Sequence, residues 1–149
     1  MGRTKEEIKC GARVFGNAAI TLGVIGEAAL KADEFSGQKI IAQNIIPSIV
    51  LKAFSCELFL KSLVQPDAFI NIHKLNELFA LLSENEKSVI ATKVIQKLSS
   101  DDSTYNQDKF NLDLIEVANA FIDWRYFYEE PRTINIAFFN ALFEVLSEK

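Results

Sequence analysis

The sequence predicts an all-α protein in which five to six helices pack as a largely antiparallel bundle. Three observations favour helices over strands. The 149-residue chain contains only three prolines and six glycines, apolar residues recur at intervals of three and four, and a helix-starting capping box stands near the middle. Because 49% of the residues are hydrophobic, the chain can bury one continuous core but is short for two. We therefore expect one domain over residues 1–149.

The first predicted helix spans about residues 5–31, where apolar residues keep a helical spacing. Four glycines interrupt it: Gly11, Gly16, Gly23 and Gly26. Each glycine costs about 1 kcal/mol relative to alanine inside a helix. Their number therefore indicates either a break or the close approach of another helix, and we expect close packing.

The second predicted helix spans about residues 39–64, and Pro47 should kink or divide it because proline has no N–H to donate. A shorter helix is expected over 74–82. Ser83 and Glu86 then fit a capping box, which predicts a helix from Ser83 to about residue 98. The last two helices are expected over 108–130, ended by Pro131, and over 134–148.

Two charged residues interrupt apolar stripes in this pattern. Arg125 continues the stripe of Leu114, Ala118 and Phe121, and Glu57 continues a stripe that includes Ala53. Desolvating either charge alone would cost several kcal/mol. We therefore expect the two helices to pack with Glu57 near Arg125.

Further charges lie one helical turn from each member of this pair. Lys61 follows Glu57 at i+4, and Glu129 follows Arg125 at the same spacing, so both pairs could form within a helix or between helices. A satisfied interhelical network and a functional cleft both produce such perturbed charges. The sequence leaves these two interpretations open.

Several classes of enzyme lack the residues they need. The single histidine, His73, cannot supply the paired Glu-x-x-His motifs of a di-iron bundle, and no nucleophile elbow or glycine-rich phosphate loop is present. Cys10 and Cys56 have no CxxC spacing, so we expect buried free thiols. We predict no catalytic residue, no metal and no cofactor.

His73 begins a short predicted helix, where its ring could cap free backbone amides or reach a neighbouring helix. The aromatic residues around Tyr126 could stack on bases, but such clusters more often form a core or a dimer interface. A net charge of −4 argues against a generally basic nucleic-acid surface and leaves a local cationic cluster open.

No membrane partner is expected from the sequence. The most apolar stretch, residues 11–30, is interrupted by Arg13 and Glu27, and the N-terminus has no signal-peptide pattern. We expect a cytoplasmic protein. Twelve phenylalanines exceed what one small bundle readily hides, so we also expect a homodimer.

Three motifs, in order and spacing, resemble those of the HEPN superfamily of small helical domains. The first fits A-x-x-x-E-x-x-x-K, the second H-x-L-x-x-L and the third R-Y-x-x-E. Their defining residues are Ala53, Glu57 and Lys61, then His73, Leu75 and Leu78, then Arg125, Tyr126 and Glu129. The resemblance covers about residues 45–130.

The resemblance implies an up-and-down bundle, usually homodimeric, with a role in prokaryotic toxin, phage-defence or RNA-processing systems. Members that cleave RNA pair an arginine with a histidine four to six residues later, as a metal-independent site. Here no histidine follows Arg125, so only the arginine carries over. The candidate binding residues are those of the three motifs: Glu57, Lys61, His73, Arg125, Tyr126 and Glu129.

The expected function is therefore a non-catalytic or degenerate HEPN-like module that binds RNA or a nucleotide in bacterial defence or a toxin-antitoxin system, where an antitoxin protein is a candidate partner. Two alternatives stay open. One is an active metal-independent endoribonuclease toxin, in which Arg125 holds the phosphate and His73 or Glu57 moves the proton. The other is a purely structural dimerisation domain. Whether the chain is an enzyme is left open.

Overall fold

The computed structural model describes residues 3–32, 37–64, 71–125 and 134–149, and this part of the chain is helical without strands, which confirms the all-α prediction. The elements are α1 (Lys5–Ala32), α2 (Gly37–Ile40), the π-helical turn η2 (Ile41–Ile45), α3 (Ile46–Leu63), α4 (Leu75–Ala80), α5 (Glu84–Ser99), α6 (Gln107–Glu116), α7 (Ala120–Arg125) and α8 (Ile136–Ser147).

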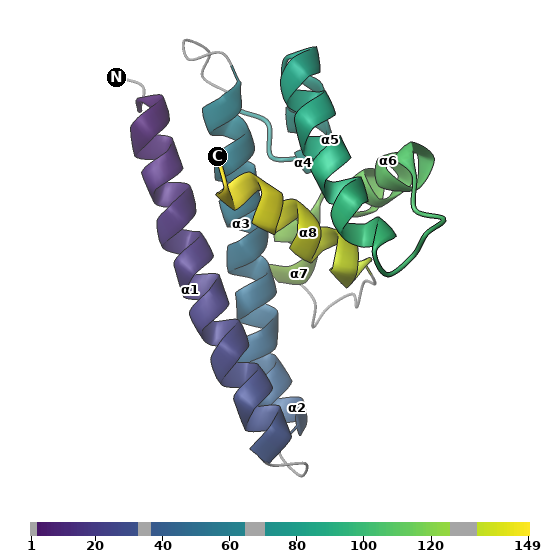
Figure 1. Ribbon diagram of the computed structural model, residues 1–149. Coiled ribbons are helices and arrows are strands. Elements are labelled where there is room, and N and C mark those ends of the chain that lie inside the picture. Colours follow the sequence, from purple (N-terminus) through teal and green to yellow (C-terminus); the bar gives the residue numbers. More distant parts are fainter. Residues whose placement is uncertain (1–2, 33–36, 65–70, 126–133) are drawn as a thin grey trace.

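A long antiparallel hairpin of α1 and α3 organises the bundle (Figure 1). The helices from α4 to α8 gather on one side of the upper part of α3, and the lower part of the hairpin extends beyond them. Among the residues that the structure describes, four phenylalanines are fully buried in the core, together with leucines from α3, α4 and α8: Phe59, Phe110, Phe138 and Phe139. The core therefore lies where the smaller helices meet α3.

The predicted second helix is present as one continuous run through α2, η2 and α3. Pro47 is the second residue of α3, and the turn before it is widened, since the Ile46 N–H donates to the Ile41 carbonyl five residues back. A residue without an N–H disturbs the regular helical ladder. The distortion predicted at Pro47 thus takes the form of a π-helical turn.

The glycines of α1 allow the close helix packing that the sequence predicts. A Cβ added at Gly16 would lie 3.0 Å from Ser55 Oγ and 3.1 Å from the Phe143 ring, and one at Gly26 would lie 2.6 Å from Ile45 Cδ1. Buried serines of α3 use this proximity. Ser48 Oγ donates to the Ala19 carbonyl at 2.7 Å, and Ser55 Oγ donates to the Ala12 carbonyl at 2.6 Å.

The prediction of one helix over 108–130 is wrong, because α6 ends at Glu116 and α7 begins at Ala120. The Ala118 carbonyl, in the break, accepts a hydrogen bond from the Leu75 N–H at the start of α4, at 2.9 Å. A carbonyl that accepts from another element in this way does not accept from an N–H four residues later, so the regular helix is interrupted there. Residues 126–133 lie outside the described part of the chain.

The capping prediction is confirmed at Ser83, whose Oγ accepts from the Glu86 N–H at 3.2 Å. The Glu86 carboxylate instead accepts from Lys149 Nζ at 2.6 Å. The last predicted helix is α8, which Asn135 caps. The expectation that both thiols are buried holds for Cys56 and is wrong for Cys10, which is exposed because it lies on the outer face of α1.

Candidate functional site

A buried carboxylate on α3 is the centre of the candidate site. The Glu57 side chain is 1% exposed, and its Oε1 accepts from Lys61 Nζ at 2.7 Å and from His73 Nδ1 at 2.9 Å. Lys61 lies one turn further along the same helix, and its side chain is 14% exposed. The two donors compensate a charge that would otherwise be costly to bury.

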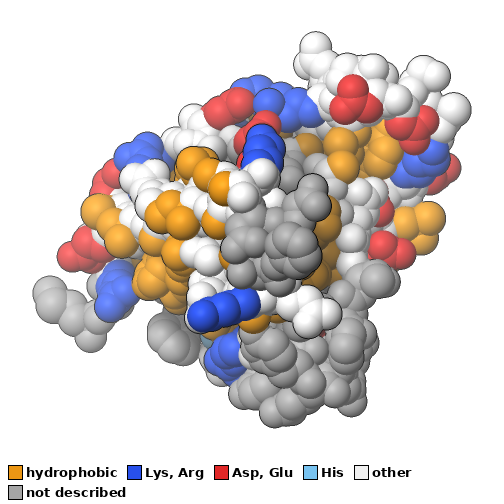
Figure 2. Space-filling model, turned by 90° about the horizontal axis from the view of Figure 1, so that it is seen from below, with side chains coloured by type: hydrophobic (Ala, Val, Ile, Leu, Met, Phe, Trp, Pro, Cys, Tyr) orange, Lys and Arg blue, Asp and Glu red, His pale blue; other side chains and the backbone are white. Residues whose placement is uncertain are grey.

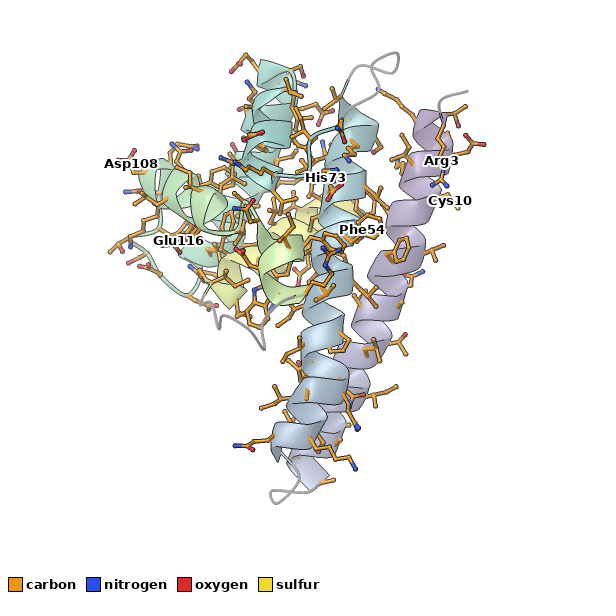
Figure 3. All side chains as sticks on the ribbon, turned by 180° about the vertical axis from the view of Figure 1, so that it is seen from behind. Arg3, Cys10, Phe54, His73, Asp108 and Glu116 are labelled. Atoms are coloured by element: carbon orange, nitrogen blue, oxygen red, sulfur yellow. The ribbon has the colours of Figure 1, made fainter. Side chains whose placement is uncertain are left out.

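The start of α4 positions His73. Leu75 and Leu78 bury their side chains in the core, and the Leu75 N–H is bonded to the Ala118 carbonyl. His73, two residues earlier, therefore reaches α3. Contact with a neighbouring helix was one of the two roles that the sequence predicted for its ring. Its side chain is 54% exposed, so the ring links the buried carboxylate to the surface (Figure 3).

This contact fixes the orientation of the imidazole. A carboxylate only accepts hydrogen bonds, so Nδ1 is the ring nitrogen that carries the proton in this contact. Nε2 is then left as an acceptor when the ring is neutral. The arrangement supplies an oriented imidazole at a half-exposed position.

The second oxygen of Glu57 is also buried. Oε2 has no hydrogen-bond partner among the residues that the structure describes. Buried carboxylate oxygens usually have such a partner. The network is thus asymmetric, because both of its hydrogen-bond donors contact Oε1.

The prediction that Arg125 is the counter-ion of Glu57 is wrong. Glu57 pairs with Lys61 and is hydrogen-bonded to His73, while Arg125 is exposed at the end of α7. The break between α6 and α7 is the physical reason, since it interrupts the apolar stripe that would have buried the arginine.

Aromatic contacts join α7 to α3 in place of the predicted ion pair. The guanidinium of Arg125 lies 5.3 Å from the centre of the Phe121 ring, and that ring lies 5.1 Å from the ring of Phe54 on α3. Figure 3 shows that Phe54, on α3, lies at a similar height along α3 to His73, which precedes α4. α7 therefore packs beside the turn of α3 that carries Glu57.

The six predicted site residues divide into three groups. Glu57, Lys61 and His73 form one network, Arg125 lies on the adjacent helix, and Tyr126 and Glu129 fall outside the described residues. Within the described ranges, no three His, Cys, Asp or Glu side chains are grouped to hold a metal ion.

Sequence reasoning missed a second polar cluster, in which Asp113 Oδ2 accepts from the Tyr105 hydroxyl and from Asn135 Nδ2. It also missed Lys52, whose Nζ donates to Asn140 Oδ1 at 2.7 Å and lies 5.3 Å from the centre of the Phe143 ring. Burial lowers the pKa of Lys52, and the charges of Glu144 and Glu27 partly oppose that shift. Neither cluster has a spacing signal, because its members come from different elements.

Comparisons with known protein families, with curated proteins and with solved structures found no match to this chain. Among the described helices, α1 is long and apolar enough to cross a membrane by length and composition. The argument for function therefore depends on the residues of the site.

Proposed function

We propose that this protein is a HEPN-like, dimeric and cytoplasmic helical module that binds RNA or a nucleotide at the surface around His73 and Arg125, in bacterial defence or a toxin-antitoxin system. The observation that carries the proposal is the exposed Arg125 on α7, a helix that packs beside the turn of α3 that holds the Lys61–Glu57–His73 network. The all-α architecture and the order of the three motifs support the assignment.

Arg125 is the residue best suited to a phosphate. It is exposed, permanently charged, and carries a planar fork of N–H donors that matches phosphate oxygens. Lys61 contributes less, because its side chain is only 14% exposed. With a net charge of −4 on the whole chain, we expect weak binding that depends strongly on salt.

A second candidate function, metal-independent RNA cleavage, is favoured by the contact between His73 and Glu57. His73 Nε2 would take the proton of a ribose 2′-hydroxyl, whose oxygen then bonds to phosphorus as the bond to the 5′-oxygen breaks. The leaving oxygen takes up a proton from water, and the products are a 2′,3′-cyclic phosphate and a 5′-hydroxyl. Glu57 would only position the imidazole, since its carboxylate is buried.

Fluorescence anisotropy with a labelled single-stranded RNA tests the binding proposal. We expect binding that weakens roughly threefold per phosphate contact between about 50 mM and about 200 mM salt, because phosphate contacts release counterions. Arg125→Ala should abolish binding, and His73→Ala should leave it nearly unchanged. Lys39→Ala is the matched control, because it removes an exposed cation at the far end of the hairpin.

Incubation of the same RNA with the protein and a chelator distinguishes the second candidate. Binding without cleavage supports the proposed module. Cleavage that is lost in His73→Ala would replace it with the endoribonuclease, and no binding to RNA or to nucleotides at low salt would leave only a structural role.

A further inference from the structure

The outer surface of α1 exposes an unusual number of large apolar side chains. Val14, Ile20, Val24 and Ile25 are between 51% and 61% exposed. The opposite face packs against α3 through small buried residues such as Gly16 and Ala19. Figure 2, which views the molecule from below, shows hydrophobic side chains gathered on the surface beside the end of the hairpin. Exposed large apolar side chains that share one helix are typical of an interaction surface.

The charges at the two ends of this surface are self-complementary. Between Arg13 and Glu27 the sequence contains no charged residue, and Ile20 is seven residues from each. A spacing of seven keeps all three on one strip of the helix surface. Arg13 and Glu27 are both exposed.

We propose that a second copy of this chain covers α1, with the two α1 helices antiparallel about a two-fold axis at Ile20. In this arrangement Arg13 lies level with the partner's Glu27, and the two-fold axis repeats the contact. A parallel pair would bring Arg13 beside the partner's Arg13 and Glu27 beside the partner's Glu27. The opposite signs therefore favour the antiparallel pair.

Lys9 and Lys31 would also lie level with each other, at the ends of the helix pair. Long lysine side chains at such positions can turn their ammonium groups into solvent. The like charges consequently oppose pairing less than the two central ion pairs favour it.

A lipid surface fits α1 less well than a second copy does. α1 contains neither tryptophan nor tyrosine, which are typical of the membrane interface, and Asn17 and Thr21 lie in the middle of its exposed face. Glu27 would also face anionic headgroups. The inference depends on the dimer in the proposed function but not on RNA binding.

Sedimentation equilibrium of the full chain tests the interface. We expect the wild type to dimerise and Ile20→Glu to raise the dimer dissociation constant by at least about tenfold, because two carboxylates would meet at the axis. Leu112→Glu is the matched control, since Leu112 is 64% exposed on α6, and it should leave the constant unchanged.

A charge exchange removes the ambiguity of a variant that fails to fold. Arg13→Glu and Glu27→Arg should each weaken the dimer, and the double exchange should restore it. If Ile20→Glu left the dimer dissociation constant unchanged, the proposed α1 interface would be wrong while the dimer itself would stand. A monomeric wild type would contradict both the interface and the dimer. A monomer whose α1 binds phosphatidylglycerol vesicles would assign the surface to lipid. RNA binding at Arg125, measured by anisotropy, reports separately on the rest of the proposed function.

Discussion

His73 Nδ1 lies 2.9 Å from Glu57 Oε1, so a half-exposed imidazole contacts a carboxylate that is 1% exposed. Lys61 Nζ reaches the same oxygen at 2.7 Å. Two donors on one buried oxygen couple α3 to the segment before α4. The stability of this part of the bundle should therefore depend on keeping the carboxylate and its donors together.

The network predicts a strong coupling between Glu57 and Lys61. Glu57→Gln and Lys61→Met should each lower the free energy of unfolding by roughly 1–3 kcal/mol, because each leaves a poorly solvated partner uncompensated. The double variant should lose clearly less than the sum. Urea unfolding followed by circular dichroism measures all three.

Glu57 and Arg125 provide the contrasting cycle. Because Arg125 is exposed and Glu57 has other ion-pair partners, Glu57→Gln and Arg125→Met should be additive within about 0.5 kcal/mol. Strong coupling between Glu57 and Arg125, or additivity between Glu57 and Lys61, would contradict the observed network.

The helices themselves were largely predictable, and the position of Arg125 was not. Local signals such as the Ser83 cap and the spacing of apolar residues in α1 depend only on neighbours in sequence, so the elements that they predict are present in the structure. The break between α6 and α7 depends on a hydrogen bond from Leu75, more than forty residues away in sequence, to Ala118. When the apolar stripe of α6 is extended through this break as if the helix were continuous, Arg125 is wrongly placed on the buried face.

The candidate site shows the same division. The sequence indicated that Glu57 is buried and that it lies one turn from Lys61, because both follow from α3 alone. It predicted Arg125 as the further partner of Glu57, which is wrong, since His73 takes that place and its position depends on how the segment before α4 returns to α3.

The glycines of α1 predict opposite effects of the same substitution. Gly16→Ala should destabilise by roughly 1–3 kcal/mol, because the new methyl group would meet Ser55 and Phe143 at 3.0–3.1 Å. Gly11→Ala should be neutral or stabilise by up to about 1 kcal/mol, because its methyl group meets only Leu58, at 3.6 Å, and alanine favours the helix. Thermal unfolding of both variants provides the comparison. Equal effects at the two positions would argue against close packing at Gly16.

Asp113 should contribute to stability through two elements at once. Its Oδ2 accepts from Asn135 Nδ2, while Asn135 Oδ1 accepts from the Phe138 N–H and caps α8. Asp113→Ala should lower the free energy of unfolding by roughly 1–3 kcal/mol, because it also leaves the Tyr105 hydroxyl without this acceptor. The control is Asp108→Ala, an exposed residue of the same helix, for which we expect a smaller loss. Losses of similar size would show that the cluster adds little.

Alkaline pH should destabilise the fold through Cys56. Burial raises the pKa of this thiol from 9.0 to about 12, and burial and the contact with Asp113 raise the pKa of Tyr105 as well. Between these values the unfolded chain binds fewer protons than the folded one, so the free energy of unfolding falls as pH rises. The contribution is complete below pH 9 and is lost towards pH 12. Lys52, whose pKa is lowered by burial, acts in the opposite direction.

A comparison of variants separates the contribution of the Cys56 thiol to the pH dependence of stability from the contributions of lysines and tyrosines. Urea unfolding at several values from about pH 8 to about pH 11 should give a shallower fall for Cys56→Ala than for the wild type, because the shifted group is removed. Cys10→Ala should keep the wild-type slope, because Cys10 is exposed. If Cys56→Ala and the wild type lost stability in parallel, the thiol would ionise as readily in the folded chain as in the unfolded one. That result would contradict the prediction, which depends on the burial of the Cys56 side chain in the core.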